Sequence, residues 1–240
     1  MEVQVLDDVA SLADRAARIF VDTAREAVRL RGGFNVALAG GSTPLRLYDL
    51  LAWDPYASEI EWKMTQLFWG DERCVPPTHI DSNYQQAQVQ LLSKIEIPAR
   101  NVHRIHGEQG ADHGAVLYEE ELRRHFGKDP VFDLVLLGIG PDGHTASLFP
   151  GSDALEENGK WVVAVPHTTP PPPLVDRISL TLPVVNAARQ VMFLVAGAGK
   201  AQIMAQVMDA NPPEPLLPAQ RVEPAQGRLI WLVEKSALGK

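Results

Sequence analysis

The sequence predicts an α/β protein built on a mostly parallel sheet with helices on both faces, a Rossmann-like three-layer sandwich. Two observations predict this class. Short, wholly apolar runs such as FNVALAG and VFDLVLLGIG are typical of strands buried on both faces of a parallel sheet. Amphipathic helical segments alternate with these runs along the chain, as expected when each strand is followed by a helix that returns across the sheet.

The first helix is expected from Val9 to Leu30, where apolar residues recur at helical spacing until two glycines end the pattern. The run from Phe34 predicts a strand that leads through the loop GGSTP into a helix over LRLYDLL. The same order is predicted for TQLFWGDE followed by DSNYQQAQVQLLSKI, with Asp81 or Ser82 capping the helix.

The later segments continue the alternation. NVHRIHG predicts a strand followed by a helix over AVLYEEELRRHF, and VFDLVLLGIG predicts another buried strand. VMFLVAG predicts a strand before the helix AGKAQIMAQVM, and the remaining strands are WVVAVP, RISLTLP and RLIWLVE. We expect one domain over residues 1–240. The proline-rich segments HTTPPPPLVDR and NPPEPLLPAQ are interpreted as surface loops near the site, because the flanking strands have no separate cores to link.

The amino-acid composition limits the kinds of molecule that this chain can bind. The net charge of −8 argues against nucleic acid and against an anionic membrane, both of which need a positive protein surface. The single cysteine, Cys74, excludes an internal disulfide and a structural zinc site. The chain lacks the basic start of a secretion signal and has no apolar stretch of the ~20 residues that span a membrane. We therefore expect a cytoplasmic protein.

Ligands of open parallel sheets bind beyond the carboxyl ends of the strands, so the loops that follow strands are the candidate sites. In AGGSTPLRLY, Gly40 and Gly41 allow a tight turn, and Ser42 and Thr43 add hydroxyls at the start of a helix. Unpaired N–H groups and the helix dipole favour an anion there, and phosphate is the natural ligand. The alternative is a well-capped helix with no ligand.

In FWGDERCVP, Asp71, Glu72 and Arg73 directly follow an apolar strand. Carboxylates beside an arginine at a strand end are typical of catalytic groups, although such a cluster can also be a solvated surface. Cys74 has no partner nearby that would activate it, so we interpret it as a packed residue.

The run GIGPDG matches G-x-G-x-x-G after a strand, which raises the possibility of a dinucleotide site. The following HTASLFPG is too short for the long helix of that motif, and the next strand does not end in an acidic residue. The loop instead presents Asp142 and His144 among glycines. His144 is the best candidate for a general base, against the alternative of a hydrogen-bonded loop histidine.

Two cations complete the candidates. Arg177 opens a strand after the proline loop, and Lys200 lies where a strand meets a helix and could bind phosphate, or else be an ordinary surface lysine. GAGKA lacks the earlier glycine and the following Ser or Thr of a P-loop, which excludes ATP or GTP binding. His103 and His106 have no companion at metal spacing and are interpreted as structural.

The segments AGGSTPLRLY, FWGDERCVPPTHIDSNYQQA and LGIGPDGHTASLFPGS, in that order, with RISLT and AGAGKA, resemble the 6-phosphogluconolactonases of the pentose phosphate pathway. The resemblance spans nearly the whole chain. It implies hydrolysis of 6-phosphoglucono-1,5-lactone to 6-phosphogluconate, with no metal and no cofactor. It implies that His144 accepts a proton from the attacking water and that Asp71 and Asp142 lie in the same pocket. The residues expected around the phosphate or sugar are Ser42, Thr43, Arg73, Arg177 and Lys200.

Two alternatives stay open. A glucosamine-6-phosphate deaminase or sugar-phosphate isomerase shares the GGSTP loop, but the deaminases carry a glutamate where this chain has Phe149. A non-catalytic sugar-phosphate sensor would normally be joined to a DNA-binding segment, and no basic helix-turn-helix stretch is present. The expected partner is a phosphorylated sugar lactone, bound by a monomer or weak homodimer.

Overall fold

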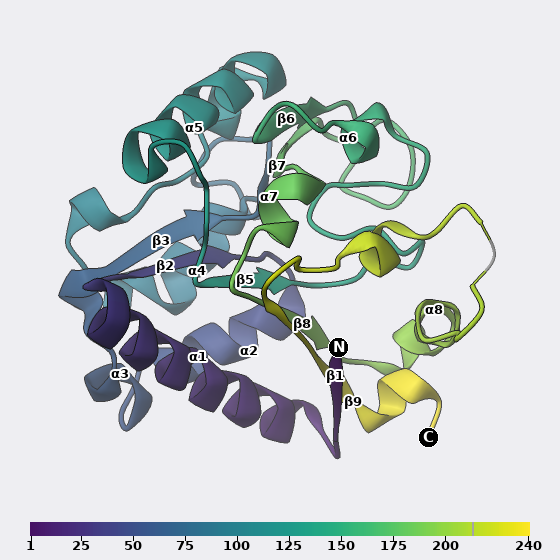
Figure 1. Ribbon diagram of the computed structural model, residues 1–240, viewed down its shortest axis with the longest axis horizontal. Helices are drawn as coiled ribbons and strands as arrows, with labels where there is room; N and C mark the ends of the chain where they lie inside the picture. Colours follow the sequence, from purple (N-terminus) through teal and green to yellow (C-terminus); the bar gives the residue numbers. More distant parts are fainter. Residues whose placement is uncertain (213) are drawn as a thin grey trace.

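The protein is described by a computed structural model that covers residues 1–212 and 214–240. A six-stranded sheet forms its centre, with the order β1-β9-β8-β5-β2-β3 (Figure 1). All neighbouring strands in this sheet run parallel. The strands are β1 (Glu2–Leu6), β2 (Phe34–Leu38), β3 (Thr65–Trp69), β5 (Leu134–Leu137), β8 (Gln190–Val195) and β9 (Arg228–Glu234).

Helices cover both faces of this sheet, which confirms the predicted three layers. On one face lie α1 (Val9–Arg31), α2 (Ser42–Leu51) and α3 (Tyr56–Glu59). On the other face lie α5 (Ala111–Phe126) and α7 (Leu182–Asn186) (Figure 1). The remaining helices are α4 (Asn83–Gln90), α6 (Asp153–Glu156) and α8 (Ala201–Val207).

The first helix shows how local sequence sets the boundaries of an element. The Asp8 side chain accepts a hydrogen bond from the Ser11 N–H and caps the start of α1. At its end, Gly32 has a φ of 76°, a left-handed conformation that glycine adopts without the penalty of a Cβ. The predicted boundaries of this helix are therefore confirmed.

A second, three-stranded antiparallel sheet has the order β4-β7-β6 and was not anticipated. It consists of β4 (Asp71–Arg73), β6 (Val162–Val165) and β7 (Arg177–Leu180). The chain leaves the main sheet at Gly70, whose N–H donates to the Leu38 carbonyl (2.9 Å) and whose carbonyl accepts from the Leu180 N–H (2.8 Å). The expectation of a loop directly after β3 is thus wrong, because β7 offers its backbone edge to residues 71–73.

The strand predicted for NVHRIHG is also wrong. This segment lies between turns of 3-10 helix at Ala99–Asn101 and Gly107–Gln109, and one isolated bridge from Val102 joins it to β3. The alternation of polar and apolar residues there reflects packing instead, since His103 stacks on Phe68 with ring centroids 4.3 Å apart. The sequence also gave no sign of β1, an edge strand whose Val3 and Val5 are 42% and 52% exposed.

The first proline-rich segment joins β6 to β7 within the small sheet, which confirms it as a loop and excludes a linker between domains. The second segment follows α8 and ends within the 3-10 helix Pro218–Arg221, and its Pro213 is outside the described residues. None of the helices within residues 1–212 and 214–240 is both long and apolar enough to cross a membrane.

The chain order of the strands creates an opening at one edge of the main sheet. After β2 the chain moves outward to β3, and it then returns to the opposite side of β2 to form β5. The loops that follow β2 and β5 therefore diverge, leaving a crevice at the carboxyl ends of these strands.

Candidate active site

A cavity of about 240 Å³ lies in this crevice. Its wall includes Gly40 and Gly41 after β2, Asp71 and Arg73 in β4, and the loop from Gly138 to Ala146 after β5. The residues predicted from sequence that line it are Gly40, Gly41, Asp71, Arg73, His144, Arg177 and Lys200. The structure thus brings together in one cavity residues that are up to 160 positions apart in the chain, from Gly40 to Lys200.

His144 and Asp142 form a close pair. The His144 Nδ1 lies 2.6 Å from the Asp142 Oδ1, and the same oxygen accepts from the His144 backbone N–H (3.2 Å). Burial alone would raise the pKa of the Asp142 carboxyl, but the hydrogen bonds and charge of His144 outweigh it and lower that pKa below 3.8. An ionised Asp142 accepts a hydrogen bond from the His144 Nδ1–H, so the Nε2 lone pair of His144 is left to act as a base.

Glycine at position 140 makes this pairing possible. A Cβ placed there would lie 2.0 Å from the His144 Nδ1 and 2.8 Å from the Asp142 Oδ1. The loop is closed by the Gly140 N–H, which donates to the His144 carbonyl (2.8 Å). The glycines of GIGPDG therefore allow the imidazole to lie against the backbone, which agrees with the rejection of a dinucleotide site.

Asp71 is 7% exposed and is held by neighbours other than the imidazole. Its Oδ2 accepts from the Ser147 hydroxyl (2.6 Å), and its Oδ1 accepts from the Asn83 side-chain amide (3.2 Å). Of the two carboxylates expected in this pocket, it is Asp142 that contacts the imidazole. Glu72, next in the chain, has a raised pKa because it is buried, and it accepts N–H bonds at the start of α4.

Arg73, Arg177 and Lys200 supply positive charge to the cavity and form no salt bridge within the described residues. Within residues 1–212 and 214–240, none of the three has a carboxylate oxygen within 4.0 Å. The Nε atoms of Arg73 and Arg177 are buried and lack a hydrogen-bond partner. Burial lowers the pKa of Arg177 and of Lys200, in the latter against the opposing charge of Asp142. An anion in the cavity would relieve this charge imbalance.

The Ser42 and Thr43 side chains are placed differently from the rest of the predicted set. They begin α2 but line a separate depression between α1, α2 and the end of β8. Only Gly40 and Gly41 of the GGSTP loop face the central cavity. Gly41 has a φ of 100° and directly precedes α2, so it is the position at which the turn requires glycine.

Several residues of the site were not found by sequence reasoning. Asn83 lines the cavity from the start of α4, and Pro171 and Pro172 close part of it from the β6–β7 loop. The ring of Phe149, already distinguished in the sequence from the glutamate of the deaminases, lies against His144, with centroids 4.5 Å apart. Position directly after a strand of the main sheet was the signal used for candidates, and Asn83, Pro171 and Pro172 do not have that position.

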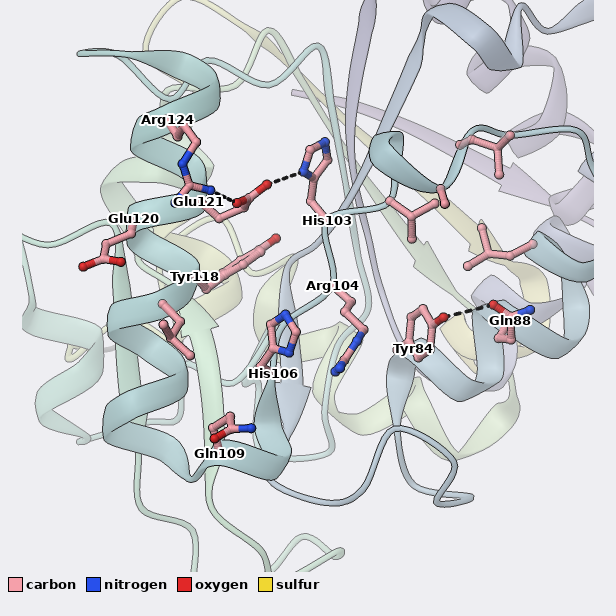
Figure 2. Close-up of a pocket in the computed structure, with 15 residues that line it drawn as sticks. Tyr84, Gln88, His103, Arg104, His106, Gln109, Tyr118, Glu120, Glu121 and Arg124 are labelled. Carbon is pink, nitrogen blue, oxygen red and sulfur yellow. Dashed lines mark hydrogen bonds and ion pairs between the residues drawn. The ribbon is translucent and has the colours of Figure 1, made fainter.

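A larger cavity of about 630 Å³ lies elsewhere, between α4, α5 and residues 92–109 (Figure 2). Figure 2 shows that Glu121 bridges His103 and Arg124 in its wall. Arg104 makes two hydrogen bonds with Glu108 (3.0 and 2.7 Å). Because these cations are already paired, this cavity is a poor site for a phosphate.

Cys74 is half-buried, and burial raises its pKa to about 11. A thiol with so high a pKa is protonated at neutral pH and is not a nucleophile. This agrees with its interpretation as a packed residue.

The fold and the cavity define a class of protein: an open α/β enzyme that binds a small anionic substrate beside a histidine–carboxylate pair. The chain belongs to the family described as glucosamine-6-phosphate isomerases/6-phosphogluconolactonase, whose family model matches residues 7–231.

Named relatives are similar over most of their length. The 6-phosphogluconolactonase of Nostoc sp. is 38% identical over 240 residues, covering 98% of this chain and 96% of the relative. The probable 6-phosphogluconolactonase 3, chloroplastic, of Oryza sativa is also 38% identical, covering 98% of this chain and 74% of the relative. The solved structure of 6-phosphogluconolactonase from Trypanosoma cruzi is 30% identical and has a TM-score of 0.88, with 100% and 96% of the two chains covered.

Proposed function

We propose that this chain hydrolyses 6-phosphoglucono-1,5-lactone to 6-phosphogluconate in the oxidative pentose phosphate pathway. One observation carries the proposal: His144, which is paired with Asp142, lines one cavity at the carboxyl edge of the sheet together with three cations that have no salt-bridge partner within the described residues. The substrate needs both parts, because it has an ester carbonyl to be attacked and a phosphate to be held. The names of the relatives support the same reaction.

The phosphate is held by Arg73, Arg177 and Lys200 together with the backbone at Gly40 and Gly41. Guanidinium groups bind phosphate oxygens through paired N–H donors, and lysine contributes a mobile point charge. The two glycines lie at the positive end of the ten-residue helix α2, which favours an anion. Ser42 and Thr43, which line the neighbouring depression, contribute to phosphate binding through their backbone only.

His144 acts as the general base. Its Nδ1–H donates to Asp142, so Nε2 takes a proton from water while the water oxygen bonds to the lactone carbonyl carbon. The resulting imidazolium is stabilised by the carboxylate at 2.6 Å and then protonates the ring oxygen as its bond to that carbon breaks. These steps need no metal or organic cofactor, because the lactone is already an activated ester.

Asp71 is assigned to the sugar rather than to the base. Its carboxylate lines the cavity, is fixed by Ser147 and Asn83, and can accept a hydrogen bond from a substrate hydroxyl. A group fixed in this way orients the substrate with little loss of conformational entropy on binding.

The proposal is tested by measuring lactone hydrolysis, corrected for the spontaneous reaction, in the wild type and in His144→Ala. Loss of a general base should lower kcat by about 10² to 10⁴-fold. His113→Ala, an exposed histidine on α5, is the matched control and should retain full activity. A His144→Ala variant with wild-type kcat would refute the assigned base.

The alternative within the family is deamination or isomerisation of a sugar phosphate. Phe149 packs on the imidazole and cannot transfer a proton, which disfavours that reaction. Ammonia release from glucosamine 6-phosphate by the wild type, without lactone hydrolysis, would establish the alternative.

We further propose that the chain works in the cytoplasm as a monomer or weak homodimer. The net charge of −8 and the single cysteine support a reducing compartment without nucleic-acid or membrane partners. Light scattering combined with activity across a dilution series tests this point.

A further inference from the structure

Asn83 lies in the wall of the catalytic cavity and carries a buried hydrogen-bond acceptor that has no partner within the described residues. It is the first residue of α4, is 2% exposed and lines the same cavity as His144. Its side-chain nitrogen donates to the Asp71 carbonyl (2.8 Å) and to the Asp71 Oδ1 (3.2 Å). Its side-chain oxygen, Oδ1, is buried and has no hydrogen-bond partner within the described residues.

The orientation of this amide is determined by its surroundings. Turning it over would place Oδ1 against two acceptor oxygens of Asp71 and would lose both hydrogen bonds. The nitrogen therefore faces Asp71, and the oxygen faces the glycine turn after β2.

The absence of a side chain at Gly40 leaves room for the Oδ1 of Asn83. A Cβ at that position would lie 1.8 Å from the Asn83 Oδ1. The two glycines of GGSTP are thus required for different reasons. Gly41 makes the turn, and Gly40 leaves space for the side-chain amide of Asn83.

A buried acceptor without a donor is destabilising, so the chemistry of the missing donor can be inferred. The phosphate and the lactone carbonyl of the proposed substrate offer only acceptors at neutral pH. The ring hydroxyls are the groups of that substrate that carry a hydrogen to donate.

We propose that the Asn83 Oδ1 accepts a hydrogen bond from one ring hydroxyl of the sugar lactone and so makes Asn83 a determinant of substrate specificity. This rests on the proposed lactonase function. Asn83 then has two tasks, since its nitrogen holds Asp71 while its oxygen recognises the sugar. A substrate lacking the hydroxyl leaves the acceptor unpaired and is rejected.

The test compares 6-phosphoglucono-lactones that lack the hydroxyl at C2, C3 or C4 with the complete lactone. In the wild type, one of the three deoxy lactones should have a kcat/KM about 10- to 100-fold lower than that of the complete lactone. In Asn83→Ala the same deoxy lactone should lose no more than about threefold relative to the complete lactone, because the acceptor is gone. Asn83→Ser, whose side chain is too short to reach, repeats the measurement if the alanine variant does not fold.

Ser147→Ala is the matched control, because Ser147 also holds Asp71 (2.6 Å) but leaves the Asn83 oxygen in place. It should keep the wild-type penalty for the deoxy lactone, whatever its activity. The proposal is overturned if no deoxy lactone loses more than about threefold in the wild type, or if Asn83→Ala or Asn83→Ser shows an unchanged penalty. Failure of the wild type to hydrolyse the complete lactone would instead reject the proposed function.

Discussion

The substitution Asp142→Asn isolates the electrostatic part of the proposed mechanism. Asparagine has nearly the same shape, so its oxygen can still accept from the His144 Nδ1–H and from the backbone N–H that Asp142 now binds. What it removes is the negative charge 2.6 Å from the imidazole. The ground state changes little, whereas the imidazolium formed during water attack loses its counter-charge.

The size of the effect follows from this contact. A hydrogen bond to a charged group is worth about 1.5 to 3 kcal/mol, which corresponds to roughly a 10- to 150-fold decrease in kcat. KM should change little, because Asp142 is not among the residues that line the cavity. Because its pKa is lowered, Asp142 stays ionised when the pH falls to its ordinary pKa of 3.8, and the wild type should lose this contribution only at more acidic pH.

The assay follows the proton released with the carboxylic acid product, using a pH indicator in weak buffer with the spontaneous rate subtracted. Asp129→Asn is the control, since this exposed aspartate precedes β5 at the opposite edge of the sheet. A kcat within about threefold of wild type at neutral pH, or a tenfold higher KM at unchanged kcat, would refute the assigned role of Asp142.

Three other outcomes are expected. Lys200→Ala should raise KM about tenfold or more with kcat nearly unchanged, and steady-state kinetics showing an unaltered KM would remove this lysine from the phosphate site. Gly140→Ala places a methyl group 2.0 Å from the His144 Nδ1 and should lower kcat about 100-fold, measured in the same lactone assay with circular dichroism as a check on folding. The hydrogen bond from Arg104 lowers the pKa of Glu108 from 4.5 to about 2, so the stability it contributes is present above pH 4.5 and is lost as the pH falls toward 2. Glu108→Gln should lower the free energy of unfolding by about 0.5 to 1 kcal/mol at pH 7 and by much less at pH 2, and equal urea-unfolding losses at both pH values would contradict this.

The strands of the main sheet could be predicted where burial leaves a strong pattern. FNVALAG and VFDLVLLGIG are apolar on both faces because β2 and β5 lie in the middle of the sheet between two layers of helices. The edge strand β1 was missed because its exposed residues carry no such pattern. The histidines at 103 and 106 misled the strand prediction, because alternation along the chain does not reveal whether a backbone partner is available.

The site was predictable where chemistry and chain position coincide. His144 and Asp142 are only two residues apart in a glycine-rich loop. Their spacing in the sequence was therefore enough to indicate that they could pair. Arg177 and Lys200 were found because each adjoins a strand end. For the hydroxyls of Ser42 and Thr43, the same reasoning did not indicate which side of the turn they face.

The sequence by itself therefore determined the α/β class and the helix and glycine signals at the loops, and it pointed to His144 as the candidate base. Tertiary structure alone decided that Asp71 lies on a second sheet, that Asn83 meets Gly40, and that three cations share a cavity without carboxylate partners. The physical reason is the separation along the chain between the residues that interact. Propensity, capping and burial patterns act between residues a few positions apart, whereas the pairing of β4 with β7 joins segments more than one hundred residues apart.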